Sequence, residues 1–265
     1  MFNRFQVAKK YFKYQLTASS GKGHGIHSPF VFDFIKNILR DKKKYDWYAI
    51  IETGRQKLLK QTAEIEVEDF GAGSAVIKTK KRAVAAITRT SVKPVKYARL
   101  LYRIVNYYQP HTILELGTSF GITTSYLAAA NAHAQVYTIE GSAAIAEIAG
   151  KTFKRMDLLN IELITGNFNS RLPSLLEKIK LVDLAFIDGN HLKEPTLDYF
   201  NQLLNCSNAS TILIFDDIHW SAGMEAAWAT IKQHPSVTLT VDLFFIGIVF
   251  FNSDISHKQH FSIRF

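Results

Sequence analysis

Cysteine is almost absent from this sequence, which has one cysteine, Cys206, in 265 residues. A single thiol excludes an intramolecular disulfide framework and a zinc site built from several cysteines. Long apolar runs are also missing, because the most apolar run, 244–251, is far too short to span a bilayer. Residues 1–13 lack the uninterrupted apolar stretch of a secretory signal. We therefore expect a soluble, cytoplasmic protein without a transmembrane segment.

Acidic residues are scarce in the first part of the chain. Residues 1–110 contain 22 Lys and Arg against 8 Asp and Glu, a net charge of +14, whereas residues 111–265 contain 10 against 15, a net charge of −5. A basic segment of this kind can serve nucleic acid, an anionic membrane, an acidic substrate or a partner's acidic face. A solvated, helix-covered surface explains the same charge, and no RNA-binding or helix-turn-helix motif decides between these interpretations.

The residue pattern changes along the chain. Residues 1–90 indicate a basic, mainly helical extension or cover, with a helix starting at Ser28 and Pro29. Residues 69–74 look like a glycine loop, but basic residues and no acid-terminated strand follow them. We interpret this stretch as a flexible cover or a basic docking loop, to which His24, His27 and Tyr45 could also belong.

Residues 91–265 predict an α/β domain with a Rossmann-like fold. An amphipathic helix is expected over residues 96–108, and short β-branched runs then alternate with helical segments. This alternation is typical of right-handed βαβ crossovers and a mostly parallel sheet covered on both faces. The last of seven strands should be antiparallel, because no helix fits before it. The expected strands are 112–116, 135–140, 161–165, 182–188, 211–216, 237–243 and 245–251.

Ligands of such a sheet lie beyond the carboxyl ends of its strands. After the first strand, Gly117 and Gly121 allow a sharp turn and a close backbone approach to a ligand. The loop is not the dinucleotide-binding type, because Ser119 replaces its middle glycine. The second strand ends in Glu140, about 20 residues after the loop, where an acid can bind ribose hydroxyls. The third strand is followed by Asn167, whose amide can reach an adenine edge.

Together these motifs resemble the class I S-adenosylmethionine-dependent methyltransferases, in particular the O-methyltransferases of the catechol and caffeoyl-CoA type and their bacterial relatives. The matching segments, within about residues 92–251, are 97–108, 113–118, 138–141, 166–167 and 186–188. The resemblance implies S-adenosylmethionine with its methionine end against residues 115–119, its ribose on Glu140 and its adenine near Asn167. The implied cofactor-binding residues are Glu115, Gly117, Thr118, Ser119, Gly121, Glu140, Asn167 and Asp188.

The same resemblance implies a metal site. The cation-dependent members hold Mg²⁺ with an Asp after the fourth strand and an Asp-Asn pair after the fifth. Here Asp188 and Asp216 match, and Asp217 stands in place of the Asn. A bound Mg²⁺ would lower the pKa of a substrate hydroxyl. The alternative is a helix cap and a ligand-facing carboxylate without metal.

His191 follows Asp188 by three residues, the spacing at which the catechol enzymes carry a catalytic lysine. An imidazole titrates near neutrality and could act as a general base, so His191 and Asp188 are the predicted catalytic residues. The alternative is an ordinary surface histidine. His219 and Trp220 are expected to line the acceptor pocket, although Trp220 could instead be a packing anchor.

The leading hypothesis is methyl transfer to oxygen on a small or medium acceptor, by proximity and orientation. A second is methylation of RNA or a protein through the basic segment, and a third is a non-catalytic binding protein that retains the fold. A nicotinamide-dependent reductase is disfavoured by the glycine spacing and the antiparallel last strand. A homodimer stays open, because no apolar stripe in the sequence identifies an interface.

Overall fold

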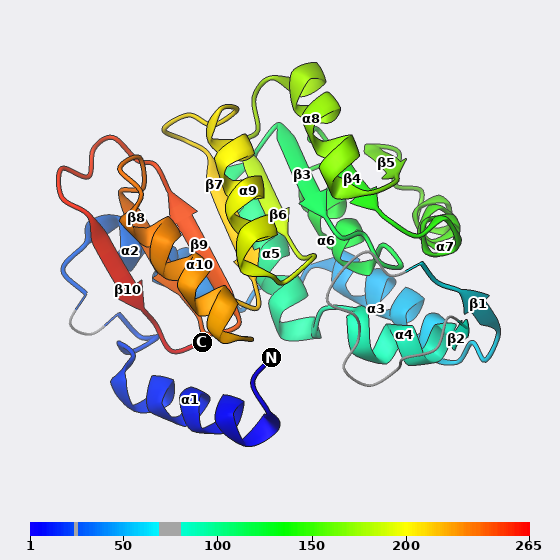
Figure 1. Cartoon of the computed structure of the whole chain (residues 1–265), viewed down its shortest axis with the longest axis horizontal. Helices are drawn as coiled ribbons and strands as arrows, with labels where there is room; N and C mark the ends of the chain where they lie inside the picture. The colour runs from blue at the N-terminus through cyan, green and yellow to red at the C-terminus, as the bar shows by residue number, and fades with distance from the viewer. Residues whose placement is uncertain (24–25, 69–80) are drawn as a thin grey trace. The chain divides into compact units, whose positions relative to one another are not determined.

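The computed structural model describes residues 1–23, 26–68 and 81–265 (Figure 1). His24 and the 69–74 loop lie outside the described residues. The chain forms two compact units, one made of residues 42–179 and the other of residues 1–41 and 180–265. The division of the chain near residue 90 stays a prediction. Among the described residues, no helix is both long enough and apolar enough to cross a membrane.

The unit of residues 42–179 is built on three parallel strands. These are β3 (Thr112–Leu116), β4 (Gln135–Glu140) and β5 (Ile161–Thr165), in the spatial order β3-β4-β5. In the register, Leu116 pairs with Ile139 and Glu140 pairs with Thr165, so the three carboxyl ends meet at one edge. The interior of β3 is completely buried, as its run of β-branched and leucine residues predicts.

Helices surround these strands. The amphipathic helix α5 (Val95–Tyr108) buries Leu100, Leu101 and Ile104, and Gln109 caps its end with a φ of 50°. The predicted helix 96–108 is therefore confirmed. The other elements of this unit are α3 (Asp46–Leu59), α4 (Val84–Ser91), α6 (Ile122–Ala130), α7 (Ala143–Arg155), α8 (Phe168–Ile179) and a small antiparallel pair, β1 (Glu64–Glu66) with β2 (Lys81–Ala83).

The second unit contains five strands in the order β6-β7-β9-β8-β10. Their bounds are β6 (Leu184–Ile187), β7 (Ile212–Asp216), β8 (Leu239–Asp242), β9 (Ile246–Phe250) and β10 (Gln259–Ser262). Strand β9 lies between β7 and β8 and is antiparallel to both, which confirms the predicted antiparallel strand. A tight turn joins β8 to β9, with Phe244 at a φ of 72°.

The prediction of seven strands is wrong by one. Apart from the small β1–β2 pair, the described residues form eight strands, three in one unit and five in the other. The additional strand is β10, which pairs parallel with β8. Its sequence, Gln259 to Ser262, has one large apolar residue and no β-branched residue, so its pairing depends on the backbone rather than on a pattern of side chains.

The helices of the second unit are α1 (Arg4–Thr17), α2 (Pro29–Phe34), which continues as a π-helix over Ile35–Leu39, α9 (Lys193–Leu204) and α10 (Ala222–Gln233). In Figure 1, α9 and α10 lie in front of the strands and α2 lies behind them. Phe30 and Phe34 of α2 contact Phe250 of β9 at ring-centroid distances of 5.0 and 6.0 Å. Parallel strands with helices on both faces and one inserted antiparallel strand are the predicted Rossmann-like α/β architecture.

Candidate functional site

The glycine loop between β3 and α6 has a backbone that favours glycine at two positions. Gly117 has a φ of 103° and Gly121 a φ of 76°, both in the left-handed half of the backbone map. A Cβ atom on Gly121 would lie 2.3 Å from Cε1 of Phe153, so a side chain there would also clash. Ser119, between the two glycines, has a φ of 49°, which is uncommon for a residue with a side chain. This local strain is typical of a ligand-binding loop.

Glu140, at the end of β4, contacts this loop directly. Its Oε2 accepts a hydrogen bond from the amide of Ser119 at 2.8 Å, and its Oε1 accepts one from the amide of Ser142 at 3.0 Å. Burial raises the pKa of Glu140, although the backbone hydrogen bonds oppose this shift. The structure thus brings together the loop and the acid that the sequence places about 20 residues later.

Glu115, the acid before Gly117, is completely buried. The hydroxyls of Thr124 and Thr138 donate to its Oε2 at 2.5 and 2.7 Å. Burial raises the pKa of Glu115 to about 7, against the opposing effect of these two hydrogen bonds. Within the described residues, its Oε1 and the buried Oγ of Ser119 have no hydrogen-bond partner. Two such atoms beside one loop indicate a place for a polar ligand or ordered water.

Asn167, the residue expected to meet adenine, lies just before α8. Its Oδ1 accepts the amide of Asn169 at 2.8 Å, and its carbonyl accepts the amide of Arg171 at 3.0 Å. The preceding Gly166 has a φ of 141°, and its amide donates to the carbonyl of Glu140 at 2.9 Å. The end of β5 is therefore bonded to the end of β4, and a role of Asn167 toward adenine stays a prediction.

No sequence pattern indicates the bonded pair on α3, Glu52 and Arg55, which contacts α6 and the segment just before α5. Glu52 accepts a hydrogen bond from Tyr126 of α6 at 2.8 Å, and Arg55 pairs with Glu52 at 2.9 Å. Arg55 also donates from Nη1 to the carbonyl of Lys93 at 2.8 Å. The charge of Lys93 in turn lowers the pKa of Glu115 slightly. No sequence signal connects Glu52 with Tyr126, because they are 74 residues apart.

The other unit brings three of the predicted catalytic and metal-binding residues together. One ligand atom each of Asp188, His191 and Asp216 lies within 4.8 Å of the others. Nε2 of His191 is 3.7 Å from Oδ1 of Asp188. Asp217, the third predicted metal ligand, is not in this group. Left-handed backbone conformations occur at Asn190, His191 and Asp217, with φ values of 65°, 31° and 54°.

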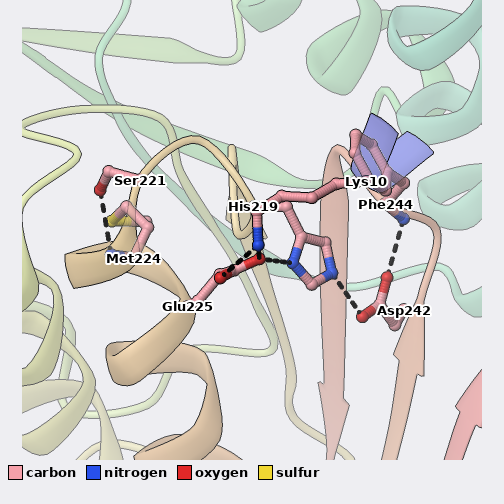
Figure 2. Close-up of polar contacts among 7 residues, drawn as sticks. All are labelled: Lys10, His219, Ser221, Met224, Glu225, Asp242 and Phe244. Atoms are coloured by element: carbon pink, nitrogen blue, oxygen red, sulfur yellow. Dashed lines mark hydrogen bonds and ion pairs between the residues drawn. The ribbon is translucent and has the colours of Figure 1, made fainter. Parts of the chain in front are cut away.

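His219, which the sequence places at an acceptor pocket, is held between two carboxylates, and its role toward an acceptor stays a prediction. Its Nδ1 lies 3.0 Å from Glu225 and its Nε2 lies 2.8 Å from Asp242, as Figure 2 shows. The imidazole also packs on the ring of Phe244 at a centroid distance of 5.1 Å. Burial alone would lower the pKa of His219, but the hydrogen bonds and charges of Asp242 and Glu225 outweigh it and raise the pKa. His219 therefore links α10 to the end of β8.

Residues 114–218 match the model of a family described as "Methyltransferase domain". No curated protein matches the chain in sequence.

Several solved structures share the fold. The O-methyltransferase TomG from Streptomyces achromogenes, in complex with SAM, is 15% identical with a TM-score of 0.57, over 96% of this chain and 100% of that one. An O-methyltransferase from Bacillus cereus, in complex with SAH, is 20% identical with a TM-score of 0.55, over 83% of this chain and 97% of that one. The SAH-bound methyltransferase PaMTH1 from Podospora anserina is 12% identical with a TM-score of 0.59, over 96% and 98%.

The matched stretch 114–218 begins in β3 and ends just after β7. It therefore contains the glycine loop, Glu140 and the group of Asp188, His191 and Asp216. This stretch is accordingly similar to a methyltransferase domain, and the chain shares its fold with the methyltransferases named above.

Proposed function

We propose that this chain transfers the methyl group of S-adenosylmethionine to a hydroxyl oxygen of a small or medium acceptor in the cytoplasm. The observation that carries the proposal is the bond between Glu140 and the amide of Ser119, which unites the ribose-type acid with the glycine loop. The carboxylate has lone pairs beyond those used by the two amides, and these can accept the ribose hydroxyls.

The methionine end of the cofactor is assigned to the glycine loop. Gly117, Thr118, Ser119 and Gly121 form the loop, and the buried Oε1 of Glu115 and Oγ of Ser119 fit polar atoms of a bound molecule or its water. The cofactor supplies an electrophilic methyl on a sulfonium. The loop and Glu140 orient that methyl, which is the main contribution that a protein makes to such a transfer.

Acceptor activation is assigned to Asp188, His191 and Asp216. In the transfer, the acceptor hydroxyl loses its proton, a carbon–oxygen bond forms, the carbon–sulfur bond breaks and S-adenosylhomocysteine leaves. His191 can take the proton, with Asp188 at 3.7 Å stabilising the imidazolium. The same three side chains fit a divalent cation, which when bound would lower the pKa of the hydroxyl. Two carboxylates and an imidazole suit Mn²⁺ or another transition metal better than the all-oxygen preference of Mg²⁺.

Calorimetric titration with S-adenosylmethionine and S-adenosylhomocysteine tests the proposal. We expect micromolar affinity for the intact chain and a loss of about 10- to 100-fold in Glu140→Ala, because charge-assisted hydrogen bonds to the ribose disappear. Glu147→Ala, at an exposed acid on α7, is the matched control and should keep the affinity. Equal affinities of the two variants would remove the ribose assignment. No binding by the intact chain would favour a non-catalytic binding protein.

The acceptor class is tested separately. A screen of catechol-like and other hydroxylated small molecules should yield S-adenosylhomocysteine, whereas turnover on RNA or protein alone would favour the second hypothesis. Steeply salt-dependent RNA binding would point the same way.

A further inference from the structure

Helix α1 has an inner apolar face that fixes its orientation. Tyr11 and Tyr14 pack on Phe244, with ring centroids 5.0 and 5.4 Å apart. The hydroxyl of Tyr14 donates to the carbonyl of Ile263, and the amide of Phe265 donates to that hydroxyl at 3.2 Å. These contacts hold α1 against the strands and the C-terminal segment of its own unit, outside the layers of α2, α9 and α10 (Figure 1). The opposite face of the helix consequently points away from them.

The outer face of α1 carries large apolar side chains in the open. Phe5, Phe12 and Leu16 expose 88%, 65% and 69% of their surface. They are seven and four residues apart, so they lie in one row along the helix. Apolar side chains scattered singly on a surface are ordinary, but an aligned row of this size marks an interaction site.

The charged residues of α1 beside this row are all cations. Arg4, Lys9 and Lys13 are exposed on either side of it, and α1 contains no Asp or Glu. Lys10, on the inner side, is bound to Glu225 of α10 at 2.9 Å, which Figure 2 shows. The outer face thus combines two aromatic rings and a leucine with three cations, the composition of a helix that lies in a membrane interface.

We propose that α1 docks the protein on an anionic lipid bilayer, with Phe5, Phe12 and Leu16 at the boundary of headgroups and acyl chains. The flanking cations then contact lipid phosphates and carboxylates. Nucleic acid binding uses the cations but gives no role to the apolar row. A protein partner would need an apolar groove with an acidic rim. An anionic leaflet offers negative headgroups above apolar chains everywhere on its surface. The proposal does not depend on the methyl transfer.

Flotation with vesicles tests this docking. The probes are vesicles of phosphatidylcholine alone and vesicles in which phosphatidylserine replaces part of it. We expect the intact chain to float with the anionic vesicles and to detach as salt is added. The variant Lys9→Gln/Lys13→Gln should bind about 25-fold more weakly, at about fivefold per cation. The variant Phe5→Ser/Phe12→Ser/Leu16→Ser should bind at least about tenfold more weakly.

Matched controls change the same residue types elsewhere. Leu159→Ser/Leu192→Ser removes two exposed leucines away from α1, and Lys57→Gln/Lys60→Gln removes two exposed lysines of α3 and its end. Both controls should float like the intact chain. All variants should keep the parent's circular dichroism and unfolding temperature, because the replaced side chains are exposed.

Three results would overturn the proposal. One is an intact chain that ignores anionic vesicles. Another is a serine triple variant that still binds them normally, which would leave charge alone as the cause. The third is a dimer by analytical ultracentrifugation that the triple variant abolishes, since the row would then be an interface between two copies of the chain.

Discussion

His219 Nε2 lies 2.8 Å from Oδ2 of Asp242 while its Nδ1 lies 3.0 Å from Glu225, so one imidazole is held between two carboxylates. Glu225 also accepts from Lys10 of α1, and Asp242 accepts the amide of Phe244 at 2.8 Å. Two anions and two cations therefore alternate when the imidazole is protonated. The chain Lys10–Glu225–His219–Asp242 connects α1, α10 and the β8–β9 turn (Figure 2).

Replacing His219 by glutamine should destabilise the protein more at low pH than at high pH. The pKa of His219 is raised in the folded state, so its stabilisation is fully present below the unfolded-state pKa and is lost as pH rises through the folded-state pKa. We expect a loss of about 2 kcal/mol in unfolding free energy at pH 6 and a smaller loss at pH 9. Urea unfolding at both pH values measures it. Exposed His257→Gln is the control, and an equal loss at both pH values would contradict the charged imidazole.

Glu115→Gln should stabilise the ligand-free protein at pH 8. Burial raises the pKa of Glu115 to about 7 in the folded protein, so the unfolded chain releases this proton at lower pH than the folded one does. The unfolding free energy therefore falls as pH rises from 4.5 to about 7. Above pH 7 this lowers the unfolding free energy by about 3 kcal/mol, and glutamine avoids the loss because it does not ionise. The unfolding free energy of the variant minus that of the parent should therefore increase from pH 5 to pH 8. Glu177→Gln, at an exposed site on α8, should show no such increase.

Much of the fold was predictable because its signals are local. The antiparallel β9 follows from chain length, since residues 243–246 leave no room for a crossover helix. Helix α1 was not placed individually within residues 1–90, and the structure shows that it is apolar on two opposite faces, with Tyr11 and Tyr14 on one and Phe5 and Phe12 on the other. Strand β10 has too few apolar residues to be recognised, and its pairing with β8 is a backbone property.

The candidate site was predictable where a residue directly follows a parallel strand. Glu140 meets the glycine loop as expected, because neighbouring strands end at one edge. Asp217 was grouped with Asp216 because the resembled family has an Asp-Asn pair at this place. In the structure Asp217 follows the end of β7 with a φ of 54° and is not among the clustered ligand atoms. The contact of Glu52 with Tyr126 depends on the packing of α3 against α6, which no local pattern encodes.

Arg55→Met should destabilise the protein by about 2 kcal/mol, because it removes the charged partner of Glu52, to which the hydroxyl of Tyr126 still donates. It also removes the donor to the carbonyl of Lys93, which lies just before α5. Urea unfolding of the variant measures the effect, with Lys57→Met at an exposed site on the same helix as the control. Equal stability of the two variants would show that the Glu52–Arg55 pair contributes nothing.

Removing single ligands should separate Asp216 from its neighbour Asp217. Because the ligand atoms that lie together belong to Asp188, His191 and Asp216, we expect Asp188→Asn and Asp216→Asn to weaken Mn²⁺ binding by about 100-fold or more. Asp217→Asn, one residue away, should leave the Mn²⁺ affinity unchanged and is the matched control. Paramagnetic resonance of free Mn²⁺ measures binding without an acceptor. If His191→Ala binds Mn²⁺ as the parent does while both aspartate variants fail, the imidazole is left to act as the base. Equal Mn²⁺ affinity in all four variants would instead remove the metal from the site and leave Asp188 with His191 as an acid–base pair.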